Sequence, residues 1–135
     1  SDRHSFLTNF FWGSALRREL AACQAAIAAA TGLEPRYYRP PFGLVNHAVQ
    51  EATKALGLEV VGWEARGFDT TAASPDAVVA RILRRIRPGS IVLLHDGGQD
   101  PARVVEIASR LLDGLAARGL APVRLDRLRG RCPAP

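Results

Sequence analysis

The sequence predicts an α/β fold in which parallel β-strands alternate with α-helices. The first observation is that short apolar runs of strand length, such as Leu58–Trp63 and Ile91–Leu94, alternate with longer amphipathic segments. The second is that two of these longer segments open with strong helix-start signals, because Ser74-Pro75 and Asp100-Pro101 each place a capping side chain before a proline. Repeated strand–helix units of this kind are typical of a parallel sheet.

Four helices are expected, each with a start or end signal. They cover about residues 14–30, 46–56, 74–87 and 100–119. Ser14 and Asn46 are the expected caps of the first two, since short polar side chains accept hydrogen bonds from the first free backbone N–H groups. In the last helix the expected inward side chains are Val104, Val105, Ala108, Leu111, Leu112 and Leu115.

Four short strands are expected at Arg36–Arg39, Leu58–Trp63, Ile91–Leu94 and Pro122–Leu125. The first stops at Pro40-Pro41, because proline has no N–H to donate to a neighbouring strand. Ile91–Leu94 is apolar throughout, which is typical of a strand buried on both faces. Residues 1–128 therefore form one domain or part of one, and residues 129–135 form a tail without a pattern. The pattern leaves open whether the sheet is doubly wound or part of a barrel.

Composition places limits on the partners of this chain. The 135 residues, 47% of them hydrophobic, can build one packed core, and no apolar run approaches the roughly 18 residues of a membrane span. The net charge is +5, and Lys54 is the only lysine. The densest arginines, at positions 81, 84, 85 and 87, interleave with apolar residues as on the solvated face of a helix. We therefore expect no nucleic-acid partner, and a basic nucleic-acid-binding domain is a weaker alternative.

Residues with side chains suited to catalysis or ligand binding follow three of the expected strands. Arg39-Pro40-Pro41-Phe42-Gly43 follows the first, Trp63 and Asp69 follow the second, and His95-Asp96 follows the third. In parallel sheets, ligands and chemistry collect at the carboxyl ends of the strands, and histidine exchanges a proton near neutral pH. Each feature also has a purely structural interpretation, as a rigid turn, a core aromatic, a loop cap or a hydrogen-bonding histidine. Their succession at strand ends favours a common site.

With these motifs, the chain resembles the polysaccharide deacetylases of carbohydrate esterase family 4, which include chitooligosaccharide and peptidoglycan deacetylases. Arg39 to Gly43 fits the family pattern R-x-P-[YF]-G, Trp63 with Asp69 fits its fourth motif, and Leu93-Leu94-His95-Asp96 fits its fifth. The resemblance covers the chain from residue 1 to about Leu125. It implies the C-terminal part of a distorted (β/α) barrel.

The resemblance also implies roles for six of these residues. His95 is similar to the general acid that protonates the leaving amine, and Asp69 to the residue that orients it and favours its charged form. Arg39 resembles the arginine that positions an upstream aspartate base. Phe42 is expected to supply a backbone N–H to the oxyanion, and Trp63 and Leu93 are expected to wall the acetyl pocket.

The family's second motif, H-[ST]-x-x-H, supplies two histidine ligands to a divalent metal. The opening Ser1-Asp2-Arg3-His4 resembles this motif without its first histidine, so His4 is the implied metal ligand. The family's Asp-Asp motif, which contains the base, has no counterpart in this sequence. The chain therefore looks like part of a longer deacetylase. The implied cofactor is a divalent ion, with zinc the usual occupant of such sites.

The expected function is metal-dependent hydrolysis of acetyl groups from the N-acetylated amino sugars of a chitin- or peptidoglycan-like polysaccharide or oligosaccharide. The alternative is a truncated, catalytically inactive family member that binds glycan. The resemblance points to the cell envelope or to secretion for the full-length protein. Without its leading strands, the chain is expected to expose an unpaired sheet edge and to associate.

Overall fold

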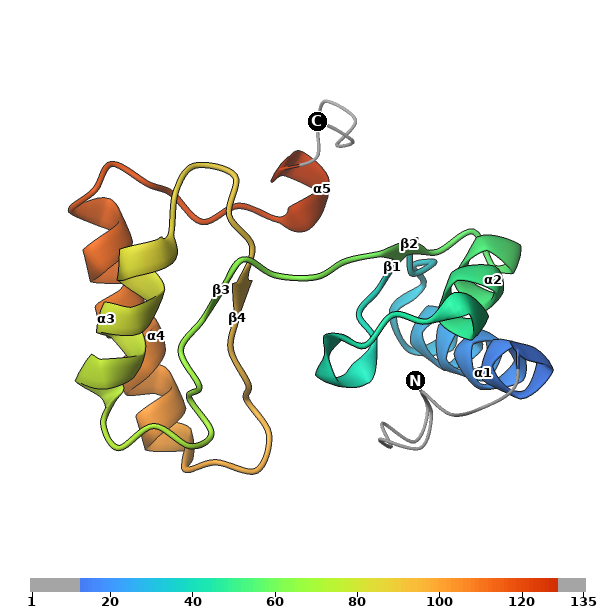
Figure 1. Ribbon diagram of the computed structural model, residues 1–135, viewed down its shortest axis with the longest axis horizontal. Coiled ribbons are helices and arrows are strands. Elements are labelled where there is room, and N and C mark those ends of the chain that lie inside the picture. The colour runs from blue at the N-terminus through green and yellow to red at the C-terminus, as the bar shows by residue number, and fades with distance from the viewer. Residues whose placement is uncertain (1–12, 129–135) are drawn as a thin grey trace. The chain divides into compact units, whose positions relative to one another are not determined.

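The computed structural model describes residues 13–128, and the chain divides into two compact units, residues 1–62 and 63–135. We call them the N-terminal unit and the C-terminal unit. Each contains a pair of short parallel strands together with helices that pack on one another (Figure 1). The predicted α/β class with parallel strands is confirmed.

The N-terminal unit contains, in order, α1 (Gly13–Thr31), β1 (Tyr37–Tyr38), the short 3-10 helix η2 (Pro41–Gly43), α2 (His47–Ala55) and β2 (Glu59–Val60). Strands β1 and β2 are parallel, with Tyr37 opposite Glu59. Helices α1 and α2 pack together, and their apolar faces meet the strands in one core of buried side chains: Leu16, Leu20, Tyr38, Val49, Ala52 and Leu58.

The predicted helix ends in this unit are confirmed at α2 and wrong at the start of α1. The Asn46 side chain caps α2, because its Oδ1 accepts a hydrogen bond from the N–H of Val49 at 2.9 Å. Ser14 lies inside α1, which already includes Gly13, so Ser14 is not its cap. Strand β1 is shorter than Arg36–Arg39 and ends before Pro40, where the ladder loses its donor.

The C-terminal unit contains β3 (Ala65–Arg66), α3 (Pro75–Arg85), β4 (Val92–Leu93), α4 (Pro101–Ala116) and α5 (Leu125–Leu128). Strands β3 and β4 are parallel, with Ala65 opposite Val92 and Arg66 opposite Leu93. Ser74 caps α3 and Asp100 caps α4, and each is followed by proline as predicted. One short hydrogen-bonded ladder, β3 with β4, and the two long helices α3 and α4 thus surround the strand ends described below.

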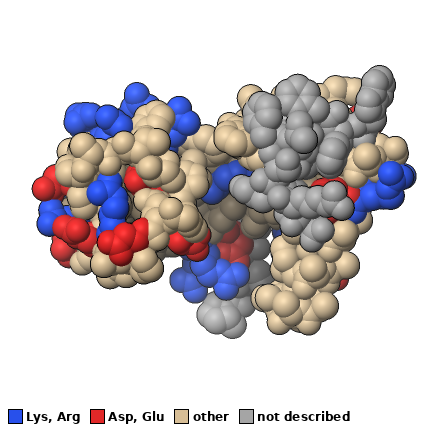
Figure 2. All heavy atoms as spheres, turned by 90° about the horizontal axis from the view of Figure 1, so that it is seen from below, with Lys and Arg blue, Asp and Glu red and all other residues tan. Residues whose placement is uncertain are grey.

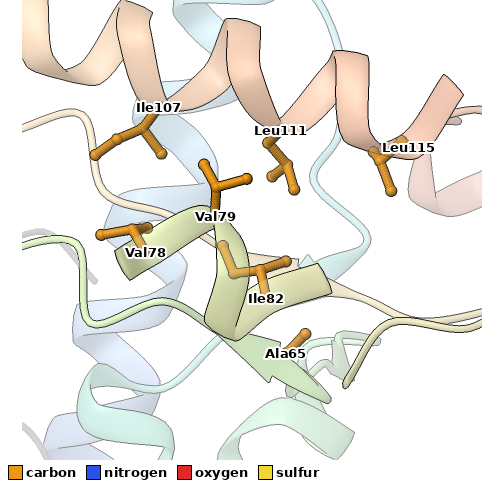
Figure 3. Packing of buried hydrophobic residues seen from close by; sticks show 7 residues of the cluster. All are labelled: Ala65, Val78, Val79, Ile82, Ile107, Leu111 and Leu115. Carbon is orange, nitrogen blue, oxygen red and sulfur yellow. The ribbon is translucent and has the colours of Figure 1, made fainter. Parts of the chain in front are cut away.

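The core of the C-terminal unit lies between α3, α4 and β3. Figure 3 shows Ile107, Leu111 and Leu115 of α4 directed toward Val79 and Ile82 of α3. Ala65 brings β3 into the same cluster and is fully buried. Burial of side chains this size contributes roughly 1.5–3 kcal/mol each, so this cluster holds the two helices on the strand pair.

The inward face of α4 differs from the prediction. Leu111 and Leu115 are buried as expected, but Val105 is 68% exposed and Leu112 is 49% exposed. Ile107, which was not predicted to face inward, is only 2% exposed. The buried stripe runs at i, i+4 and i+8 through Ile107, and Val105 and Leu112 lie away from that stripe because each residue turns about 100° around the helix.

Two strand predictions are wrong. Only Glu59–Val60 of the predicted strand Leu58–Trp63 is in a ladder, and the chain then forms β3, which was not predicted. Pro122–Leu125 is not a strand. Arg124 pairs with Asp126 at 2.7 Å, and the Arg124 carbonyl accepts from the N–H of Leu128, so these residues support the single helical turn α5.

The surface of the C-terminal unit carries charges of both signs. On the face that Figure 2 shows, basic and acidic side chains lie among one another over the part formed by α3 and α4. Arg110 of α4, for example, pairs with both Asp76 and Glu106. Among residues 13–128, no helix is long and apolar enough to cross a membrane.

Candidate functional site

The candidate site lies at the carboxyl ends of β3 and β4. Asp69 follows β3 by three residues, and His95 follows β4 by two. Because the two strands are parallel and in register, both side chains emerge at the same end of the ladder. The fold thus brings together two residues that are 26 positions apart in the chain.

Asp69 and His95 make two kinds of hydrogen bond. The backbone N–H of His95 donates to Asp69 Oδ2 at 2.7 Å, and His95 Nδ1 lies 3.1 Å from Asp69 Oδ1. An ionised carboxylate can only accept, so the ring nitrogen facing it carries the hydrogen. Asp69 is 3% exposed, whereas the side chain of His95 is 49% exposed. The carboxylate therefore holds the ring by Nδ1, and Nε2 is the ring nitrogen on the side away from that contact.

Gln99 is a third member of this cluster and was not among the predicted site residues. Its Nε2 donates to Asp69 Oδ2 at 3.2 Å and to the carbonyl of His95 at 2.9 Å. Both partners are acceptors, which fixes the orientation of the amide. The one sequence signal was its position four residues after His95, close enough for its side chain to return to that backbone.

The hydrogen bonds also determine the charge of Asp69. Burial of Asp69 disfavours its ionised form, but the hydrogen bonds from the His95 N–H, the His95 ring and Gln99 outweigh burial and hold the pKa of Asp69 below its ordinary value. Asp69 is therefore an anion at neutral pH. A buried anion with three donors is a fixed, oriented partner for the imidazole.

Gly67 allows the chain to pass close to α3 just before Asp69. A Cβ atom on Gly67 would lie 2.3 Å from Val78 Cγ1 and 3.1 Å from the Val78 carbonyl oxygen. Only a residue without a side chain can pass α3 this closely. Phe68 then adopts a φ of 56°, a left-handed conformation that is uncommon outside glycine. This tight turn brings Asp69 back toward β4.

The other predicted site residues are distributed over both units. Leu93 is half-buried in β4, and Trp63 is half-buried just before β3. Arg39 and Phe42 belong to the N-terminal unit, where Arg39 Nη2 donates to the carbonyl of Gly62 at 3.3 Å. Phe42 is 69% exposed, with a φ of 58°. The catalytic and substrate-binding roles of these residues stay predictions.

The predicted metal ligand His4 lies outside the described residues. Within residues 13–128, no group of three His, Cys, Asp or Glu side chains is placed to hold a metal ion. Asp69 and His95 supply two such groups, and Gln99 is not one of the expected ligand types. The described residues therefore do not form a metal site by themselves, and the predicted zinc stays a prediction.

An apolar cavity of the C-terminal unit is separate from this cluster. It has a volume of about 270 Å³ and is lined mainly by apolar residues from Ile86 to Val92 and from Leu120 to Leu128. Asp69 and His95 do not line it. The small cavity beside the acid–imidazole pair has a volume of about 10 Å³, roughly the room for one water.

Comparison with known proteins shows the family of this chain. Residues 4–61 match the family model for polysaccharide deacetylase. A bifunctional xylanase/xylan deacetylase of Cellvibrio japonicus is 36% identical over 119 residues, which cover 87% of this chain and 17% of that protein. A peptidoglycan-N-acetylglucosamine deacetylase of Bacillus cereus is 33% identical over 97 residues, covering 70% of this chain and 46% of that protein. The chain therefore spans less than half the length of these relatives.

Solved structures agree on the fold. A family 4 carbohydrate esterase from Streptomyces lividans, in complex with acetate, matches with a TM-score of 0.81 and 31% identity over 98% of this chain and 66% of that chain. The Xyl-CE4 domain of a multidomain xylanase from the hindgut metagenome of Trinervitermes trinervoides has the same fold, with a TM-score of 0.81 and 23% identity over 95% of this chain and 60% of that chain. The chain belongs to the polysaccharide deacetylase family, and its parallel α/β part has the fold of the family 4 carbohydrate esterases.

Proposed function

We propose that this protein hydrolyses acetyl groups from the N-acetylated sugars of a polysaccharide or oligosaccharide. The observation that carries the proposal is the contact between Asp69 and His95 at the carboxyl ends of two parallel strands. Family membership and the deacetylase names of two relatives support it. A polymer of this kind would place the reaction in the cell envelope or outside the cell.

His95 is the proposed general acid. In amide hydrolysis, water adds to the acetyl carbon, the C–N bond breaks, and the departing amine needs a proton. The buried Asp69 carboxylate holds Nδ1, so Nε2 presents the proton to that amine. Asp69 is a positioning residue that also stabilises the charged imidazolium. Gln99 keeps Asp69 and the His95 backbone in place.

The remaining proposed roles rest on the sequence motifs. The Phe42 N–H is proposed to stabilise the oxyanion, Trp63 and Leu93 to line the acetyl pocket, and Arg39 to position an aspartate base. Dependence on a divalent ion, with His4 among its ligands, is proposed on the same ground. When bound, such an ion polarises the acetyl carbonyl and lowers the pKa of water.

Acetate release tests the proposal directly. The protein, in its full-length form, is incubated with N-acetylated chitooligosaccharides and with peptidoglycan fragments, with and without added Zn²⁺, and free acetate is measured. We expect ion-dependent release and a loss of about 100-fold or more in His95→Ala. His47→Ala is the matched control, since His47 is an exposed histidine at the start of α2.

Metal content separates the two possible roles of His95. As a general acid, His95 can be removed without loss of the ion, so bound zinc should be equal in the wild type and His95→Ala. Equal loss of zinc and activity would make His95 a ligand and contradict the assignment. Binding of glycan without any acetate release would favour the catalytically inactive alternative.

A further inference from the structure

The side chains of two arginines, Arg66 and Arg81, lie against the ring of Phe68, next to the proposed site. The guanidinium carbon of Arg66 lies 4.2 Å from the centre of the Phe68 ring, and that of Arg81 lies 5.1 Å from it. Both distances are within the range of cation–π attraction. Arg66 comes from β3 and Arg81 from α3, so the ring joins two elements that are separate in sequence.

The acidic side chains nearby in sequence are engaged elsewhere. Asp69 accepts from His95 and Gln99, and Asp76 pairs with Arg110 of α4. Among residues 13–128, Arg66 forms no ion pair, and Arg81 donates its Nη1 hydrogen to the carbonyl of Gly67 at 3.2 Å. Two positive charges beside one ring disfavour each other, and a bound anion would offset that cost.

The ring is held in place by the backbone. Gly67 lies against Val78 of α3, and Phe68 follows it with a φ of 56°. A bulky residue keeps such a conformation only when its surroundings enforce it, and conformations of this kind cluster at functional sites. The ring is still 40% exposed, so it is held and yet open to a ligand.

The position of the ring ties it to the proposed reaction. Phe68 directly precedes Asp69, and successive Cα atoms are about 3.8 Å apart. Arg66 pairs in register with Leu93, two residues before His95. The ring therefore lies next to Asp69, just beyond the carboxyl end of β3.

We propose that Arg66, Phe68 and Arg81 form a binding site for a carboxylate on a sugar next to the one that is deacetylated. This inference rests on the proposed function and makes the preferred substrate an acidic glycan. Guanidinium groups match carboxylates in geometry and charge, and these bonds are shorter and stronger than neutral ones. A uronic acid and a lactyl ether on an amino sugar present the same carboxylate, and the experiment distinguishes them.

Binding to the whole chain tests the site without any need for turnover. Affinity is measured by calorimetry for an oligogalacturonate, for a glycan fragment with free lactyl carboxylates, and for a neutral chitooligosaccharide of equal length. We expect tighter binding of at least one acidic glycan, weakening with added salt. Whichever acidic glycan binds more tightly identifies the source of the carboxylate.

Substitutions then locate the site. Arg66→Gln with Arg81→Gln should weaken acidic-glycan binding by about tenfold or more, and leave binding of the neutral glycan within about twofold. Arg66→Lys keeps the charge but loses the two-pronged donor, so an intermediate loss is expected. Arg84→Gln with Arg85→Gln is the matched control, because both are exposed on the same helix. Thermal unfolding confirms that each variant is folded.

Three results would overturn the inference: equal affinity for acidic and neutral glycans, unchanged affinity in the Arg66 and Arg81 variants, or equally tight, Arg66-independent binding of single-stranded DNA. Acetate release is followed in parallel. Arg66-dependent binding without release would count against the proposed function alone, whereas release with no preference for acidic glycans would count against the inference alone.

Discussion

At the scale of single residues, the site depends on one buried anion. Asp69 is 3% exposed and receives hydrogen bonds from the His95 backbone, the His95 ring and Gln99. Removing one donor leaves the others, but removing the acceptor leaves three donors unpaired in a low-dielectric setting. The cluster should therefore respond most strongly to changes at Asp69.

Asp69→Asn is expected to lower kcat for acetate release by about 100-fold or more, with a smaller change in KM. The amide is nearly the same size, but it can present an N–H to Nδ1, which would turn the ring to the wrong tautomer. Steady-state kinetics measure the effect. Asp96→Asn is the control, since Asp96 is the exposed neighbour of His95, and an equal loss in both variants would contradict this role.

Stability should fall in acid because of the same residue. The pKa of Asp69 is lower in the folded chain than in the unfolded one, so its ionisation stabilises the fold above the unfolded value of about 3.9. That contribution is lost as the pH falls through the lower, folded pKa. Denaturant unfolding from pH 7 to pH 2 should show a steeper loss in the wild type than in Asp69→Asn. Parallel curves for the two proteins would refute the linkage.

Gln99→Glu should weaken the hydrogen bonds that hold Asp69 and His95 in place, although Gln99 has no proposed contact with substrate. The introduced carboxylate would lie beside Asp69, and two adjacent negative charges repel each other. The pKa of Asp69 or of the introduced glutamate should therefore rise. Carboxyl titration by NMR measures that rise in the chain alone. Gln99→Asn, which keeps the amide on a shorter side chain, is the comparison, and the same titration in both variants would mean that Gln99 is only a loop residue.

At the scale of elements, local signals predicted the helices well and the strand pairing poorly. Ser74 and Asp100 before proline located α3 and α4 because capping is a local interaction. Strand β3 was missed because Ala65-Arg66 has no apolar alternation of its own and is defined by pairing with Val92 and Leu93. Gln99 was missed for the same reason, since its partner Asp69 is 30 residues away.

The packing of α4 gives a test with a built-in control. Ile107→Ala removes a side chain that is 2% exposed, and should lower the free energy of unfolding by about 2–5 kcal/mol. Val105→Ala removes a side chain that is 68% exposed on the same helix, and should change it by less than about 0.5 kcal/mol. Urea unfolding of both variants measures the difference. Similar losses would show that the helix is rotated from the arrangement in Figure 3.

At the scale of the whole molecule, each of the two β-sheets of the described residues consists of only one pair of short strands. Each sheet has two strands, β1 with β2 and β3 with β4, so within residues 13–128 every strand has one edge without a strand partner. Two-stranded sheets are marginal in water and gain their stability from packing against helices, as both units show in their separate cores. Exposed strand edges pair readily with other chains.

The chain is therefore expected to associate through its strand edges. Light scattering during size-exclusion chromatography should give a mass above that of one chain, increasing with protein concentration. An edge variant is the sharper test: Val92→Pro removes a backbone donor from β4 and should reduce association through that edge. Because it can also weaken the β3–β4 ladder, Val92→Ala serves as the packing control, which keeps the backbone donor. A sharply melting monomer at every concentration would show that the edges of these ladders do not recruit a second chain.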